Sequence, residues 1–295
     1  MAWGSALVAL VAFLHVMSIV KLPALFGSGY RSYVVLLAAL LIWIAAVFRK
    51  GTKPAGQLRR GKLPKRTLCA AVMIFLCIPF TVLAGIYWFG DRKYVFISLL
   101  VLLETMLPFV LVFEGRKPKT RELVTIAVLC ALGVAGRAAF FMLPQFKPVV
   151  AIAIIAGVAL GGETGFLVGA VTMLVSDMFF GQGPWTPWQM FALGLIGFLA
   201  GVLFQKGLLS RDRGTLTVFG ALSALVIYGG IINPASALMW QTQINWQMVL
   251  TYCISGFPMD AVLAAATAAF LWIFGEAMLE KLDRIKVKYG LVDLQ

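Results

Sequence analysis

The sequence contains few charged residues and a single histidine, and its four cysteines include no close pair. Charged side chains make up 13% of the 295 residues and hydrophobic ones 61%, whereas soluble domains average about 25% and 45–50%. Apolar runs of 16 to 23 residues recur along the chain. This pattern excludes a soluble enzyme, a disulfide-stapled secreted module and a disordered chain. We therefore expect an all-α polytopic membrane protein.

Sequence motifs for catalysis and metal binding are also lacking. The chain has no GxxxxGK[ST] phosphate loop and no HExxH or other close metal-ligand cluster. His15 lies in an apolar run, where packing is a commoner role than catalysis. The cysteines all fall inside apolar runs, so we interpret them as small core residues. We expect no enzymatic activity, no metal and no cofactor.

Breaks at polar, proline and glycine residues divide the chain into ten apolar runs, which predict about ten transmembrane helices. The runs occupy residues 4–20, 33–48, 67–89, 94–113, 122–143, 148–160, 164–180, 188–206, 215–232 and 248–274. Alternate connections carry 19 and 5 lysines and arginines. The positive-inside rule therefore places both termini in the cytoplasm of a cell whose plasma membrane holds the protein. Because these basic residues lie in short loops and not on one folded face, no nucleic-acid partner is expected.

The sixth run is too short to cross a flat bilayer alone. Residues 148–160 make about 20 Å of helix at 1.5 Å per residue, against a hydrocarbon core of about 30 Å. We infer that neighbouring backbone enters the membrane inside a protein-lined cavity. The alternative is a re-entrant hairpin of 148–160 with 164–180.

A polar stretch near residues 114–121 divides the chain into two regions of different amino-acid composition. Residues 1–115 hold four runs with few polar groups, and we interpret them as an accessory membrane region of unknown role. Residues 116–295 hold six runs with most of the glycine and most of the buried charge. No internal repeat is evident, which disfavours an inverted-repeat secondary transporter.

Four charged residues lie inside apolar runs, where each is costly unless it faces a cavity or a partner. They are Glu104, Arg137, Asp177 and Asp260. Counting residues from the outer ends of the runs places Arg137 about 9 Å deep, Asp177 about 4.5 Å and Asp260 about 18 Å. We interpret Arg137 as half of a structural ion pair, as part of a ligand site, or as both. By depth, Asp260 should be the carboxylate most protected from water.

Two outer connections are rich in indole and amide groups. Gly181 to Gln189 combines two glycines and two prolines with Trp185 and Trp188, as expected of a pre-ordered loop over a ligand or, alternatively, of an interfacial aromatic belt. Residues 233–247 carry no charge but several amides, which suit a neutral, hydrogen-bond-rich solute. The candidate ligand residues are Arg137, Lys147, Asp177, Gln182, Trp185, Trp188, Gln189, Asn233 and Asp260.

A ladder of small residues marks the fifth run. Ala127, Ala131 and Ala135 recur every four residues and share one helix face. Such a smooth face permits close approach of another helix. The helix is either a neighbour in the same bundle or part of a separate membrane subunit.

The last six runs contain four features that together resemble one transporter family. They are the alanine ladder, the short run after Gln145 to Pro148, the GPWTPWQM turn at 183–190, and the ending Phe257-Pro-Met-Asp260 followed by 281–290. Through these, residues 120–290 resemble the substrate-binding S components of energy-coupling-factor (ECF) vitamin transporters. The closest resemblance is to the branch assigned to cobalamin and related corrinoids.

The resemblance implies a six-helix unit that binds a vitamin, with a corrinoid favoured, from outside. It further implies docking, through Ala127, Ala131 and Ala135, on a transmembrane coupling subunit that carries two ATPase subunits. The lack of a phosphate loop agrees with that division of labour. The alternatives are a membrane-embedded enzyme, a small-solute channel or a self-sufficient secondary transporter, none of which predicts associated ATPases.

Overall fold

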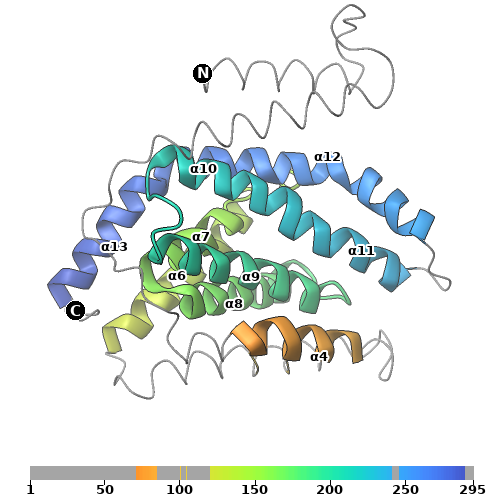
Figure 1. Cartoon of the computed structure of the whole chain (residues 1–295), viewed down its shortest axis with the longest axis horizontal. Helices are drawn as coiled ribbons and strands as arrows, with labels where there is room; N and C mark the ends of the chain where they lie inside the picture. Colours follow the sequence, from red (N-terminus) through yellow and green to blue (C-terminus); the bar gives the residue numbers. More distant parts are fainter. Residues whose placement is uncertain (1–70, 85–99, 101–103, 105–119, 241–245, 290–295) are drawn as a thin grey trace, which may run out of the picture.

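A computed structural model of the chain describes residues 71–84, 100, 104, 120–240 and 246–289. All regular structure in these residues is helical, and three single turns are π-helical (Figure 1). The elements are η1 (Met73–Cys77), α4 (Ile78–Ala84), α6 (Thr120–Ala139), α7 (Val149–Leu160), α8 (Gly162–Phe180), α9 (Thr186–Gln205), α10 (Arg213–Leu222), η4 (Ser223–Tyr228), α11 (Gly229–Trp240), α12 (Trp246–Phe270), η5 (Leu271–Gly275) and α13 (Glu276–Tyr289).

The six expected runs from residue 122 onward are all confirmed as helices. Five helical stretches are long and apolar enough to cross a membrane: Arg121–Ala139, Gly162–Phe180, Thr186–Gln205, Arg213–Trp240 and Trp246–Lys288. The sixth is the shorter α7. The chain is thus a multi-pass membrane protein. Most of the first four runs lies outside the described residues, so the total of ten stays a prediction.

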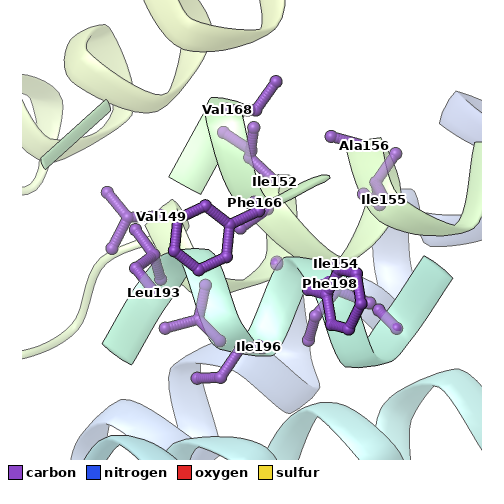
Figure 2. Packing of buried hydrophobic residues seen from close by; sticks show 14 of the residues in the cluster. Val149, Ile152, Ile154, Ile155, Ala156, Phe166, Val168, Leu193, Ile196 and Phe198 are labelled. Carbon is purple, nitrogen blue, oxygen red and sulfur yellow. The ribbon is translucent and has the colours of Figure 1, made fainter. Parts of the chain in front are cut away.

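Helices α7, α8 and α9 form the centre of the bundle. All residues of α7 from Val149 to Ala159 are buried, and Ile154 and Ile155 are almost fully enclosed. Figure 2 shows Phe166 of α8 and Ile196 of α9 packed together with the isoleucines of α7 in this cluster. Because α7 is apolar all round, it needs partners on every side. Its neighbours in the bundle supply them.

Glycine allows these three helices to touch backbone to backbone. A Cβ atom at Gly157 would lie 2.1 Å from the carbonyl oxygen of Gly197, and one at Gly197 would lie 2.3 Å from that of Gly165. Atoms of real side chains do not approach so closely, so neither position accepts even alanine without a shift of backbone. The glycine content of the later runs therefore reflects close helix packing.

Two long helices with π-helical turns complete the bundle. Arg213–Trp240 runs through α10, η4 and α11, and Trp246–Lys288 runs through α12, η5 and α13. Asp212 caps the first of them, because its carboxylate accepts a hydrogen bond from the Thr215 amide at 2.9 Å. In Figure 1, α13 extends down one side of the bundle toward the start of α6.

The end of α7 is held by basic side chains from this region. Lys286 of α13 donates a hydrogen bond to the carbonyl oxygen of Ala159 at 2.6 Å. Arg211 donates to the neighbouring Val158 carbonyl and pairs with Asp283 at 3.2 Å. The last carbonyls of a helix have no partner within it, so these cations satisfy groups that would otherwise be unpaired. They also fix α13 against the short helix.

The described residues of the accessory region, residues 1–115, pack on the same bundle. Ile74 and Ile78 are fully buried, and the ring of Phe75 lies edge-on to that of Phe198 in α9, with 6.4 Å between centroids. Glu104 accepts a hydrogen bond from Thr81 of α4. The charged residue expected in the fourth run thus has a partner within the accessory region and contributes nothing to the site described below.

Candidate functional site

An ion pair joins α6 to α8 near one end of the bundle. Arg137 Nη1 donates hydrogen bonds to Asp177 Oδ1 at 2.6 Å and to Ser176 Oγ at 2.7 Å. The Asp177 side chain is fully buried, and that of Arg137 is 13% exposed. A buried carboxylate needs such a partner to remain ionised. The pairing considered from the sequence is therefore present in the fold.

A small enclosed polar cavity of about 50 Å³ lies beside this pair. Its polar lining consists of Arg137, Gln145, Lys147, Gln189 and Tyr228. Val149, Met173 and Leu263 supply the apolar wall. The cavity is therefore lined by residues from many segments, namely α6, the connection before α7, α7, α8, α9, η4 and α12. Such convergence of polar groups inside apolar helices is typical of a ligand site.

Two of these lining residues were not among the candidates from the sequence. Tyr228 lies within an apolar run, where nothing in the sequence pattern indicates that its hydroxyl faces a cavity. Gln145 has a φ of 56°, which is unusual for a residue other than glycine. The Gln145-Phe-Lys-Pro stretch is part of the family resemblance, but nothing in the sequence indicates that the Gln145 side chain lines a cavity. A strained backbone of this kind is common where a loop forms part of a site.

Lys147 is a half-buried cation without a side-chain partner among the described residues. Its backbone amide donates to the Gln145 carbonyl at 3.0 Å, which closes a tight turn. Burial lowers the pKa of Lys147, and the charge of nearby Arg137 lowers it further, while Asp177 opposes this. The ammonium group therefore lies in a site that disfavours its charge.

The GPWTPWQM turn contributes buried polar atoms to the same region. Trp188 Nε1 and Gln189 Oε1 are buried and have no hydrogen-bond partner among the described residues. Buried polar atoms are normally hydrogen-bonded, and an unmet one costs about 1–3 kcal/mol. Both side chains were candidates from the sequence. Their unmet hydrogen-bonding capacity fits a position facing a ligand.

Aromatic residues of the two segments expected as outer connections meet in the structure, but the expectation that 233–247 is a connection is wrong, because residues 233–240 belong to α11 and 246–247 to α12. The rings of Trp185 and Trp240 lie 6.4 Å apart and inclined by 32°. Gly183 leaves room for Trp185, because a Cβ atom there would lie 2.4 Å from the indole ring. The Thr186 amide donates to the Gly183 carbonyl at 3.0 Å, so the turn is internally fixed. Gln182 is half-buried in the same turn.

Asn233 and Asp260 form a second polar pair, between α11 and α12. Asn233 Nδ2 donates to Asp260 Oδ2 at 2.6 Å. A Cβ atom at Gly229 would lie 2.4 Å from the same carboxylate, so Asp260 packs on the backbone next to Tyr228. The pair borders the polar cavity but does not line it.

Burial of the two carboxylates within the fold does not follow their expected depths in the bilayer, so the expectation that Asp260 is the better protected from water stays a prediction. Asp260 is 8% exposed, whereas Asp177 is fully buried. Counting residues along a run gives the depth of a side chain in a bilayer. The burial of a side chain within the fold depends instead on which other helices pack against it. Asp177 lies on the well-buried helix α8, and the Arg137 side chain, which also donates to Ser176, lies against it.

The alanine ladder lies on the outside of the described bundle. Ala127, Ala131 and Ala135 are exposed and, with Leu167 and Val171 of α8, line an open apolar groove of about 870 Å³. No described helix covers these alanines, so packing within the described bundle does not account for them. Within the described part of the chain, the ladder therefore has no helix packed on it.

Taken together, these features define a multi-pass membrane protein with an enclosed polar site between its helices. The family model described as ECF-type riboflavin transporter, S component, matches residues 117–274, more than half of the chain. The chain therefore belongs to the family of ECF-transporter S components, as the sequence resemblance predicted. This family consists of transporter subunits and not of enzymes.

Curated relatives support the same assignment. A UPF0397 protein of Aliivibrio fischeri (strain MJ11) is 33% identical over 173 residues, which cover 56% of this chain and 92% of that protein. A UPF0397 protein of Vibrio atlanticus (strain LGP32) is 28% identical over 129 residues, covering 41% of this chain and 70% of the relative. No solved structure shows a significant match.

Proposed function

We propose that this protein is the substrate-capturing subunit of an ECF-type importer and that its ligand binds at the cavity between Arg137, Lys147 and Gln189. The observation that carries the proposal is that polar groups from many elements converge on one small cavity inside an apolar bundle. Polar groups at such a place are costly to maintain and usually serve binding or transport. Membership of a transporter-subunit family supports the same role.

The proposed orientation has the cavity near the outer face and both termini in the cytoplasm. Basic residues gather at the opposite end of the helices, where Arg211, Arg213 and Lys286 lie. The positive-inside rule assigns that end to the cytoplasm. A ligand would therefore enter past the turn that carries Trp185 and Trp188.

The proposed ligand set keeps all nine residues expected from the sequence, in two groups. Arg137, Lys147, Asp177 and Gln189 lie at or against the cavity, and Gln145 and Tyr228 join them. The outer part of the proposed site would be formed by Gln182, Trp185, Trp188, Asn233 and Asp260. A cavity of about 50 Å³ has room for a small polar group of a ligand, since on the same measure one water needs about 10–15 Å³. The rest of the ligand would extend toward the tryptophans.

For the identity of the ligand, the preference for a corrinoid gains no support from the comparisons. The matching family model is of the riboflavin type, and the UPF0397 relatives carry no substrate in their names. We therefore propose a vitamin-like organic solute as the ligand class. Riboflavin and cobalamin are the first two compounds to test.

The exposed alanine ladder is the proposed docking surface for a transmembrane coupling subunit that carries two ATPases. Small side chains allow a partner helix to approach closely, and the groove beside them is apolar. The family match begins at residue 117, which supports a division into an accessory region, 1–115, and a substrate-binding unit, 116–295. The role of the accessory region is open to deletion analysis.

Affinity purification tests this proposal directly. The tagged full-length protein, extracted from its native membrane in mild detergent, should bring down two ATPase subunits and a transmembrane coupling protein. A tagged, unrelated membrane protein of similar abundance is the control. A lone enzyme, a channel or a self-sufficient secondary transporter would purify without ATPases, and that outcome would contradict the proposal.

A further inference from the structure

We propose that the ligand presents an anionic oxygen group, a carboxylate or a phosphate, to the polar cavity, and that Lys147 is the side chain that binds it. The inference rests on the proposed function, because it names the chemistry of the ligand at the same site. It commits to a charge that neither the family match nor the relatives specify, and it excludes riboflavin itself, which carries no carboxylate or phosphate.

The balance of charge around the cavity favours an anion. Arg137 and Asp177 lie 2.6 Å apart and neutralise each other. Asp260 is hydrogen-bonded to Asn233 and does not line the cavity. Lys147 is then the one lining cation without an acid partner among the described residues. An anionic group on the ligand would supply that partner.

The remaining polar lining can donate hydrogen bonds to the same group. Tyr228 has a hydroxyl, and Gln145 and Gln189 have amide NH₂ groups. Asp177 accepts from Arg137 through Oδ1, while its buried Oδ2 has no hydrogen-bond partner among the described residues. Because Asp177 does not line the cavity, the lining itself holds two cations and no carboxylate. Charge-assisted bonds from an ammonium to an anionic oxygen are among the stronger ones. A space of about 50 Å³ accommodates a group of that size.

The surroundings of Lys147 agree with this role. Burial and Arg137 lower its pKa, so the free protein holds the ammonium in an unfavourable place. A bound anion would reverse that effect. A lysine at such a position is better explained by a ligand than by stability, because its ammonium group makes no hydrogen bond or ion pair with the described residues.

Small anions can test the proposal without knowledge of the ligand. The purified full-length protein is titrated with acetate, with inorganic phosphate and with neutral acetamide at constant ionic strength, and its thermal unfolding is followed. Acetate or phosphate should raise the melting temperature, because a ligand that binds only the folded state stabilises it. Acetamide should not. Stabilisation by acetate alone would identify a carboxylate site, and by phosphate alone a phosphate site.

Matched variants make the result specific to one side chain. Lys147→Met should weaken anion binding roughly tenfold or more, since a hydrogen bond to a charged group is lost. Lys147→Arg should retain binding, and Lys281→Met, which removes an exposed cation of α13, should behave as the wild type. Equal stabilisation by acetamide, or unchanged anion binding by Lys147→Met, would overturn the proposal.

The native ligand gives a second, independent readout. Mass spectrometry of the compound extracted from protein purified from its native membrane should reveal a carboxylate or phosphate group. A ligand with no anionic group would overturn the inference while leaving the importer assignment intact. Absence of ATPases from the purified complex would instead contradict the proposed function, so the two failures are distinguishable.

Discussion

Helices α6 and α8 are both apolar and nearly equal in length, yet they have opposite relations to the bundle. Of the most apolar window of each helix, 72% is buried in α8 and 28% in α6. Gly165 and Gly169 of α8 face the backbone of α9, whereas Ala131 of α6 faces outward. Small residues thus have two uses in this protein, because glycine brings helices of one chain together and alanine leaves a smooth outer face.

Arg137 connects the exposed helix α6 to the buried helix α8. Arg137 extends from the mostly exposed α6 to the fully buried Asp177 of α8. The polar cavity lies at this junction. A helix that is loosely covered by its own bundle is therefore anchored at one end by an ion pair, and a partner docked on its outer face would lie on the same helix as the ligand site.

The largest effect on stability is expected from the buried ion pair. Asp177→Ala should lower the free energy of unfolding by about 3–5 kcal/mol, because it leaves the Arg137 charge without its partner. Asp260→Ala should cost less, since its partner Asn233 is neutral. Thermal or denaturant unfolding of the purified variants measures both. If Asp260→Ala lowers the free energy of unfolding more than Asp177→Ala does, depth in the bilayer predicts the effect of these substitutions better than burial in the fold.

Glycine packing should give the next largest effect. Gly197→Ala introduces a methyl group 2.3 Å from the Gly165 carbonyl oxygen, which forces α8 and α9 apart, and should destabilise by about 1–3 kcal/mol. Gly230→Ala is the matched control, because nothing lies within 4 Å of a Cβ atom there. It should be neutral or stabilising, as alanine favours helix more than glycine does. Similar melting temperatures for the two variants would show that α8 and α9 can move apart to accommodate a methyl group at little cost in stability.

These positions also show what the sequence could and could not predict. Length and apolarity predicted the six later helices, since both are local properties. Arg137 and Asp177 were identified as charges inside runs, but their 2.6 Å contact depends on how α6 packs on α8. Tyr228 was missed because its hydroxyl lies within an apolar run. Cavities arise from several segments at once, so a pattern in one segment does not reveal them.

A smaller effect is expected at the aromatic contact between the turn at 183–190 and α11. Trp185→Ala removes a ring that pairs with Trp240 and is proposed to cover the ligand. One aromatic contact with the bound ligand is worth about 0.5–1.5 kcal/mol beyond area burial, so its loss should make ligand release roughly two- to tenfold faster. Stopped-flow measurement of release tests this. Trp246→Ala, which removes an indole that is 73% exposed, is the control. Unchanged release from Trp185→Ala would favour a simple interfacial belt.

The smallest effect on stability is expected on the outer face of α6. Ala131→Trp adds a bulky group where no described helix packs, so the free energy of unfolding should change by less than about 0.5 kcal/mol. Ligand binding by the isolated protein should also remain. Uptake by cells should nevertheless be lost, because the indole prevents close approach of a partner helix to the alanine ladder.

The same substitution at another exposed alanine separates docking from a general effect of a large surface group. Ala265→Trp lies on α12, away from the ladder, and should leave uptake unchanged. Co-purification of ATPase subunits should be lost with Ala131→Trp and kept with Ala265→Trp. Normal uptake by Ala131→Trp would mean that the exposed face of α6 meets lipid, and the contrast between α6 and α8 would then reflect packing alone.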